Sequence, residues 1–153
     1  MQIRPAHQLD ARAFATFLIE LDWFSYVKGK SFEEILQVCE RNLAVESDRV
    51  LLVAVEGETI LGYANLVFNH TMWLPGPSAY LSELFIHPEA RGKGVGSALI
   101  NAVIDAATQA NAYRIMLNNS RERDSYTRGF YLKHGFEERP EMANFVLKLH
   151  GKS

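Results

Sequence analysis

The sequence predicts an α/β protein in which a mixed sheet carries helices on both of its faces. The first half of the chain is rich in hairpin signals, because the apolar runs 50–55 and 59–68 are separated only by a short turn containing Gly57. The second half alternates apolar runs with helical patterns, in the order strand, helix, strand, helix. Such an alternation packs helices against the faces of a shared sheet.

The individual elements follow from local patterns in chain order. Gln2–Pro5 is predicted as a short strand, and apolar residues at helical spacing predict a helix over 9–21. Ser31 and Glu34 form a capping box that opens a helix ending near Ala44. The remaining predictions are strands at 50–55, 59–68, 78–86, 113–117 and 145–149, and helices at 95–110 and 124–134. The apolar face of the 95–110 helix is predicted to hold Val95, Leu99, Val103, Ala106 and Ala110.

Composition narrows the class of protein. A chain of 153 residues favours a single domain over 1–153, and 48% hydrophobic with 22% charged residues is ordinary for a globular protein. The net charge of −2 offers no basic footprint for nucleic acid, and no apolar run is long enough to cross a membrane. The single Cys39 excludes an intramolecular disulfide and a cysteine-based metal site. We therefore expect a cytoplasmic protein that holds no metal.

Residues 91–96 (RGKGVG) follow the 78–86 strand and its terminal Pro88. Gly92, Gly94 and Gly96 lie within five residues, directly before a helical pattern. Glycines let the backbone approach a ligand closely, and the free N–H groups of a helix N-terminus bind phosphate. Arg91 and Lys93 add positive charge. The segment therefore predicts a site for a phosphorylated cofactor.

Two familiar nucleotide sites do not match this spacing. A P-loop requires Gly, four residues and then Gly-Lys-Ser or Gly-Lys-Thr, which the chain lacks. A dinucleotide fingerprint requires G-x-G-x-x-G and an acid about 20 residues further on. Residues 113–116 occupy that position and contain no acid.

The loop does match R-x-x-G-x-G, through Arg91, Gly94 and Gly96, and so resembles the acyl-CoA pyrophosphate loop of the GNAT superfamily of N-acetyltransferases. Residues 129–136 (GFYLKHGF) are similar to the F-Y-x-x-x-G-F signature of the same superfamily. Gly135 there is placed to end a helix. The resemblance covers about residues 50–149.

The resemblance implies a GNAT-like fold with a mixed, mostly antiparallel sheet of about seven strands. It also implies an acetyl group transferred from acetyl-CoA to a primary amine by direct attack in a ternary complex. The implied cofactor-binding residues are Leu84, Phe85, Ile86, Arg91, Gly92, Lys93, Gly94, Val95, Gly96, Ser97, Asn119 and Tyr131. One departure concerns Asp124, which stands where the superfamily usually has Asn; Asn119 is the residue that we expect to replace it.

Tyr131 and Glu83 are the predicted catalytic residues. Tyr131 matches the superfamily's tyrosine near the cofactor sulfur, and a phenol with a pKa of about 10 suits protonation of a thiolate. Glu83 lies in an apolar strand beside the expected cofactor cleft and is the predicted base. The alternatives are a packed aromatic for Tyr131 and a residue that only orients substrate for Glu83. Tyr63, Tyr80 and His70 are weaker choices for the base.

For the acceptor, we expect Trp23, Tyr26 and Glu83 to form a substrate site. Aromatic faces near carboxylates suit an organic cation. Residues 80–85 (YLSELF) are similar to the corresponding strand of polyamine and diamine acetyltransferases, so a small cationic amine is predicted. Loop aromatics such as those at 72–74 would alternatively form a homodimer contact. A non-catalytic acyl-CoA sensor and a peptide N-acetyltransferase are the alternative functions.

Overall fold

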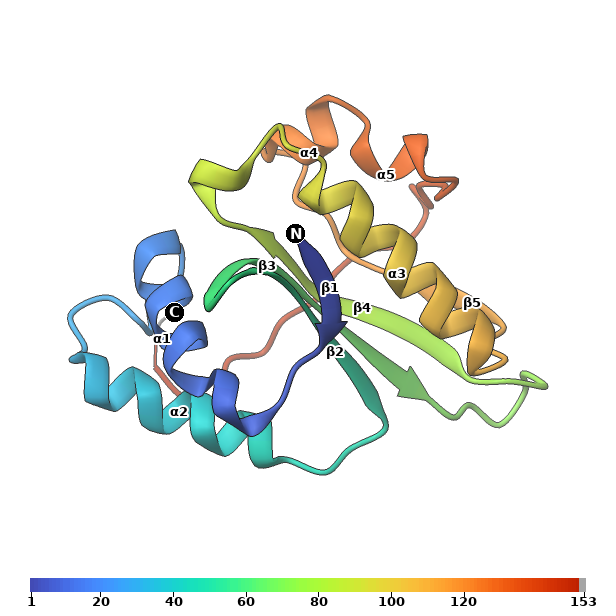
Figure 1. The fold of residues 1–153 in the computed structure, drawn as a ribbon. Helices are drawn as coiled ribbons and strands as arrows, with labels where there is room; N and C mark the ends of the chain where they lie inside the picture. The colour runs from blue at the N-terminus through green and yellow to red at the C-terminus, as the bar shows by residue number, and fades with distance from the viewer. Residues whose placement is uncertain (152–153) are drawn as a thin grey trace. The chain divides into compact units, whose positions relative to one another are not determined.

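The computed structural model describes residues 1–151 (Figure 1). The chain separates into two compact units, one formed by Met1–Met116 and one that begins at Leu117. Each unit is described by itself below. That residues 1–153 act as one domain stays a prediction.

The first unit holds a mixed sheet, as predicted (Figure 1). Its strands run in the order β1-β2-β3-β4-β5, with antiparallel pairing throughout except for the parallel pair β4–β5. The strands are β1 (Gln2–Pro5), β2 (Arg49–Glu56), β3 (Thr59–Asn69), β4 (Ser78–Ile86) and β5 (Arg114–Met116). Gly57, at φ +61°, supplies the left-handed turn of the predicted β2–β3 hairpin.

The expected number of strands is not confirmed, because the described residues form five strands rather than about seven. The predicted strand at 145–149 is wrong. Phe145 and Leu147 are exposed there, and the segment has no regular secondary structure. A strand requires a neighbour to complete its hydrogen-bond ladder, and the described part of the second unit contains no other strand.

Helices cover both faces of the sheet in the first unit, as predicted. The helices are η1 (Gln8–Asp10), α1 (Ala11–Leu21), α2 (Phe32–Ala44), η2 (Pro88–Ala90) and α3 (Val95–Gln109). In Figure 1, α1 and α2 lie together on one side of the strands and α3 lies on the other. The predicted capping box of α2 is confirmed: the Ser31 hydroxyl accepts from the Glu34 N–H at 3.2 Å, and the Glu34 carboxylate accepts from the Ser31 N–H at 2.9 Å.

The buried face of α3 differs in part from the prediction. Its buried residues are Val95, Leu99, Ile100, Val103 and Ala107. The predicted Ala110 is exposed, and Ala106 is only partly buried. The predicted face advanced by three residues from Val103 to Ala106, whereas the buried stripe advances by four, from Val103 to Ala107. Ile100, next to Leu99, widens the same stripe, because the buried face of a helix packed on a sheet is broader than a single row of residues.

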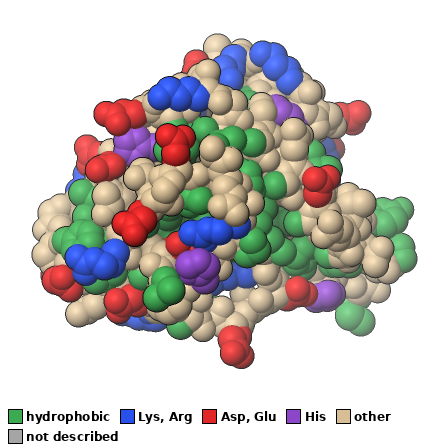
Figure 2. All heavy atoms as spheres, in the orientation of Figure 1, with side chains coloured by type: hydrophobic (Ala, Val, Ile, Leu, Met, Phe, Trp, Pro, Cys, Tyr) green, Lys and Arg blue, Asp and Glu red, His purple; other side chains and the backbone are tan. Residues whose placement is uncertain are grey.

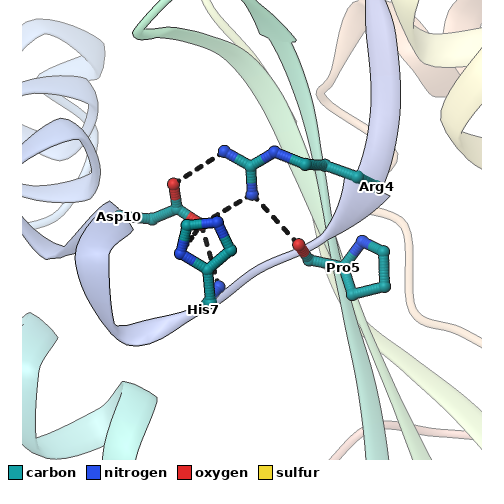
Figure 3. Close-up of polar contacts among 4 residues, drawn as sticks. All are labelled: Arg4, Pro5, His7 and Asp10. Carbon is teal, nitrogen blue, oxygen red and sulfur yellow. Dashed lines mark hydrogen bonds and ion pairs between the residues drawn. The ribbon is translucent and has the colours of Figure 1, made fainter.

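Arg4 in β1 and Asp10 in η1 anchor the start of α1 (Figure 3). The guanidinium of Arg4 donates to both carboxylate oxygens of Asp10, at 2.8 and 2.9 Å, and the His7 N–H donates to the same carboxylate at 2.9 Å. Asp10 is almost fully buried. The hydrogen bond from Arg4, reinforced by that from His7, holds the pKa of Asp10 below its usual value.

The second unit contains two short helices, α4 (Asp124–Thr127) and α5 (Phe130–Lys133), where one helix over 124–134 was predicted. Gly129 interrupts that helix because it adopts a left-handed φ of +66°. Gly135, at φ +89°, ends α5 as predicted.

Two findings concern possible partners of the chain. None of the described helices is long and apolar enough to pass through a membrane. On the face drawn in Figure 2, the Lys and Arg side chains are interspersed with Asp and Glu.

Candidate active site

A β-bulge in the pairing of β3 with β4 determines the face on which Glu83, the candidate base, lies. Asn65 pairs with Glu83, but the next residue, Leu66, pairs with Leu81, so Ser82 is an additional residue in β4. Such a bulge changes which side chains of a strand share a face. Glu83 and Phe85 follow the bulge and lie opposite Asn65 and Tyr63.

The face that carries Tyr63 is covered by α1. The rings of Phe14 and Phe17 in α1 meet the Tyr63 ring edge to face, at centroid distances of 5.2 and 5.5 Å. Phe85 packs against the same Tyr63 ring and belongs to the surrounding apolar cluster. A carboxylate on this face therefore lies beside the apolar core beneath α1 and α2.

Two hydrogen bonds hold the Glu83 carboxylate. The Tyr63 hydroxyl donates to one oxygen at 2.9 Å, and the Asn65 amide NH₂ donates to the other at 3.0 Å. Burial, together with the charge of Glu83, raises the pKa of Tyr63 far above its usual value, so this phenol remains a proton donor at any physiological pH. The carboxylate is thus oriented by two neutral donors rather than by a cation.

Glu83 opens into a cavity of about 260 Å³ between α1, α2 and the sheet. Most of the wall is apolar, and polar groups come from α2 and from three neighbouring strands. The lining residues are Phe14, Leu18, Val38, Cys39, Asn42, Leu43, Arg49, Leu51, Tyr63, Asn65 and Glu83. A small molecule with an apolar middle and polar groups fits a site of this character.

The predicted phosphate loop has the conformation that its glycines require. Gly92 and Gly94 adopt φ values of +74° and +81°, which side chains other than glycine rarely adopt. A Cβ at either position would meet no atom within 4 Å, so the space above the loop is open. Arg91 and Lys93 are exposed at its rim.

Helix α3 begins directly at this loop, with Gly94 as its N-cap. The N–H groups of its first turn have no intrahelical acceptors, and a glycine brings no side chain to cap them. Backbone donors of Val95, Gly96 and Ser97 therefore face the same open space at the positive end of the helix dipole. The loop fits the pyrophosphate of an acyl-CoA, whose charge and size match these donors.

The second half of β4 has a free edge within the first unit. β5 pairs only with Ser78–Tyr80, whereas Leu84, Phe85 and Ile86 pair with β3 on their other side. Within Met1–Met116, the backbone groups along this edge have no strand beside them, so another extended chain can pair with them. The resemblance assigned this segment to the pantetheine arm, and the open edge is the geometry that such an arm needs.

Trp23 and Tyr26 do not line the cavity that holds Glu83. The Trp23 ring lies against Phe85, at 5.6 Å between centroids, and beneath the Arg91 guanidinium, at 5.2 Å. Tyr26 is exposed, and the ammonium group of Lys30 lies 4.3 Å from its ring centroid. Trp23 thus lies between β4 and the phosphate loop, and the cation on Tyr26 is the protein's own.

In the second unit, Tyr131 packs edge to face against Phe130 and Phe136, at centroid distances of 5.0 and 5.9 Å. Burial raises the pKa of Tyr131 above its usual value, which keeps the phenol protonated as an acid must be. The Asn119 amide donates to the Ser125 hydroxyl at 3.0 Å, next to the start of α4. His70, a weaker choice for the base, is exposed and paired with Asp48.

Three polar residues of the cavity, Asn42, Arg49 and Asn65, were not predicted from the sequence. Asn65 carried a detectable signal, because it is a polar residue two positions after Tyr63 in an otherwise apolar strand. Alternate residues of a strand share a face, so Tyr63 and Asn65 could have been expected side by side. Arg49 gave no such signal, since a charged residue at the start of a strand is commonly solvated.

Comparison with known proteins identifies the class. The model of the Acetyltransferase (GNAT) family matches residues 15–136, which is most of the chain. The chain therefore belongs to the GNAT acetyltransferase family. It is an acyltransferase, of a family that uses acetyl-CoA as the acetyl donor. The recognition made from Arg91–Gly96 and residues 129–136 is confirmed.

Two curated relatives and one solved structure illustrate the match. Aminoglycoside N(6')-acetyltransferase type 1 from Stenotrophomonas maltophilia is 29% identical, over 96% of this chain and 93% of that enzyme. Thialysine N-epsilon-acetyltransferase from Bos taurus is 31% identical over 46% of this chain, and the match spans only 44% of that enzyme. An integron cassette protein from Vibrio cholerae shares the fold with a TM-score of 0.82 at 22% identity, over 96% of this chain and 91% of that one.

Proposed function

We propose that the protein transfers the acetyl group of acetyl-CoA to the primary amine of a small molecule that is cationic at neutral pH. The observation that carries this proposal is the Glu83 carboxylate, oriented by Tyr63 and Asn65 in a cavity of about 260 Å³. An ammonium group that enters this cavity meets a carboxylate able to bind it and then to take its proton. The named activities of the two relatives, on an aminoglycoside and on thialysine, are on small amines of this kind.

For the donor, we assign Arg91–Ser97 to the pyrophosphate, with the first-turn N–H groups of α3 as the principal contacts. The backbone of Leu84, Phe85 and Ile86 would pair with the pantetheine arm along the open edge of β4. Bound there, acetyl-CoA supplies an activated thioester. The chain's contribution is to hold its carbonyl carbon where the amine can attack.

Glu83 acts as the base in this proposal. It accepts one proton from the ammonium group, which frees the nitrogen lone pair to attack the thioester carbonyl directly in the ternary complex. The C–N bond forms, the C–S bond breaks, and the thiolate leaves with the electron pair. Tyr131 is the proposed acid for that thiolate; the nitrogen loses its second proton to solvent as the amide forms, and solvent reprotonates the phenol. Asn119 is the polar residue that we assign to the pantetheine in the second unit. Trp23 and Tyr26 remain proposed acceptor contacts at the rim.

An acceptor screen tests the proposal as a whole. Thiol release from acetyl-CoA should be seen with polyamines, amino acids or aminoglycosides, and not with N-terminal peptides alone. Activity on peptides only would support the peptide acetyltransferase alternative. Acetyl-CoA binding without turnover of any amine would support the non-catalytic sensor and overturn the assignment of Glu83.

A glycine substitution tests the cofactor loop separately. Acetyl-CoA should raise the melting temperature of the wild-type protein through linkage, whereas ATP and NAD should not. Gly94→Val should abolish that rise, because the new side chain would occupy the open space above the loop.

Gly57→Val is the matched control for that experiment. Gly57 also has a positive φ and open space around it, but it lies in the β2–β3 turn. The control should lose comparable stability and still respond to acetyl-CoA. A Gly94→Val protein with a normal response would refute the assignment of the loop.

A further inference from the structure

The cavity that holds Glu83 carries opposite charges at two separated positions. Glu83 contributes a carboxylate from β4, and Arg49 contributes a guanidinium from the start of β2. Between them, Asn65 pairs with Glu83 on one side and with Leu51 on the other. Arg49 lies two residues from Leu51 and therefore on the same face of β2.

The Arg49 guanidinium has N–H donors that its hydrogen bond to Asn42 does not use. One of its terminal nitrogens donates to the backbone carbonyl of Asn42 in α2, while an arginine side chain has five N–H donors in all. Among the described residues, no carboxylate lies within ion-pair distance of this guanidinium. The side chain is partly buried. A half-buried guanidinium of this kind is suited to bidentate binding of a carboxylate.

At the Glu83 end of the cavity, the side-chain oxygen of Asn65 is a hydrogen-bond acceptor that has no donor among the described residues. Its NH₂ group donates to Glu83, and this fixes the amide orientation, because the reversed amide would place its oxygen against the carboxylate. The amide oxygen is buried and has no hydrogen-bond partner among the described residues. Leaving a buried acceptor unsatisfied costs free energy, so such an atom marks a place where a ligand donor belongs.

The distance between Glu83 and Arg49 limits the length of a ligand that contacts both. Glu83 and Arg49 are two strand spacings and two residues apart, which places their Cα atoms about 12 Å from each other. Both side chains line the cavity and shorten the span that a ligand must cross. The wall between them is apolar, through Phe14, Leu18 and Leu51, and suits a short alkyl chain.

We propose that the acceptor is a small amino-carboxylate, bound with its ammonium group at Glu83 and Asn65 and with its carboxylate at Arg49. This inference rests on the proposed function and changes one point of it: the amine that reacts is still a cation, but the acceptor as a whole is a zwitterion because its far end is anionic. Arg49 is then a specificity-determining residue, and Asn65 positions the ammonium group beside the base.

Matched acceptors test this directly in the wild-type protein. 5-Aminopentanoate, pentylamine and pentane-1,5-diamine each have a five-carbon chain with a primary amine at one end, and they differ in whether the other end is anionic, apolar or a second, cationic amine. We expect kcat/KM to be highest for 5-aminopentanoate, with 4-aminobutanoate as a shorter comparison. Thiol release from acetyl-CoA measures all four.

Variants of Arg49 test whether the carboxylate of the substrate binds at this residue. Arg49→Gln should lower kcat/KM for 5-aminopentanoate about 10- to 100-fold through KM, since a hydrogen-bonded charge pair is lost, and should lower it much less for pentylamine. Arg49→Lys should restore part of the preference. Arg41→Gln is the matched control, because Arg41 is exposed in the last turn of α2 and does not line the cavity.

The outcomes separate this inference from the function on which it rests. Turnover of polyamines or aminoglycosides with no turnover of the amino-carboxylates would overturn the inference alone. An Arg49→Gln protein that loses activity equally toward 5-aminopentanoate and pentylamine would do the same. If no amine of any kind is acetylated, the proposed function fails, and the inference fails with it.

Discussion

The two faces of the β3–β4 pair differ sharply in chemistry although they share the same backbone. On the face toward α3, Ala64 and Leu66 are completely buried, and Leu99 packs close to Gly62. On the opposite face, beneath α1 and α2, the same strands present the side chains that hold and surround the Glu83 carboxylate. One face is purely apolar, and the other contains a polar cluster inside an apolar setting.

This difference shows where stability and function lie in the first unit. Burying apolar side chains against α3 stabilises the fold and creates no unsatisfied group. Burying a carboxylate and an amide costs free energy, and only part of that cost is offset by their mutual hydrogen bonds. The remaining unpaired oxygen of Asn65 among the described residues supports our proposal that the polar face binds a ligand.

The largest expected effect is on the polar face. Glu83→Gln keeps the size of the side chain but removes the base, so kcat should fall about 10²- to 10⁴-fold while the melting temperature changes little. The pH profile of kcat should also lose its dependence on a carboxylate. Steady-state kinetics and a thermal melt measure both properties.

Glu58→Gln, in the exposed β2–β3 turn, is the control for that experiment and should have normal kinetics. Glu83 would be an orienting residue rather than a base if the variant retained kcat and changed only KM.

The next effect is on the apolar face and should concern stability alone. Leu99→Ala removes a fully buried side chain, so the free energy of unfolding should fall by about 2–5 kcal/mol. Activity per folded molecule should remain, because the polar face is intact. Urea unfolding and kinetics at low temperature measure the two quantities.

Leu9→Ala is the comparison for Leu99→Ala, since Leu9 is 90% exposed and should contribute within about 0.5 kcal/mol. Loss of kcat in fully folded Leu99→Ala protein would show that the two faces are coupled. It would contradict the assignment of stability to the apolar face and of activity to the polar face.

The smallest effect concerns the anchor that holds α1 over the polar face. Asp10→Asn should reduce the free energy of unfolding by about 1–3 kcal/mol at neutral pH, because Arg4 loses a charged partner. The pKa of Asp10 is lowered in the folded state. Its contribution is therefore fully present above the ordinary value of 3.8 and is lost as the pH falls through the lower, folded pKa.

Urea unfolding at pH 7 and at successively lower pH should thus show wild type and Asp10→Asn converging in acid. Asp105→Asn, on the exposed side of α3, should be neutral throughout. A difference between wild type and Asp10→Asn that persists unchanged in acid would contradict the ion-pair explanation.

Much of the fold was predictable because its determinants are local. The Ser31 capping box, the Gly57 turn and the left-handed glycines of residues 91–96 each depend only on residues a few positions away in the sequence. Each is therefore predicted from the sequence, and the structure contains all three. The bounds of β1 and β4 were likewise predicted; for β4, an apolar run between Pro77 and Pro88 marks the strand. Family membership followed from two such local patterns, and the family match confirms it.

The sequence by itself thus determined the class of fold and the family, while the cofactor loop and the role of Glu83 stay predictions. Only the tertiary structure decided that the sheet of the described chain has five strands, and that the cavity beside Glu83 includes Asn65 and Arg49. Strand count and cavity composition depend on which distant segments pair and in which register. The additional residue at Ser82 shifts that register, and no local pattern reports such a shift.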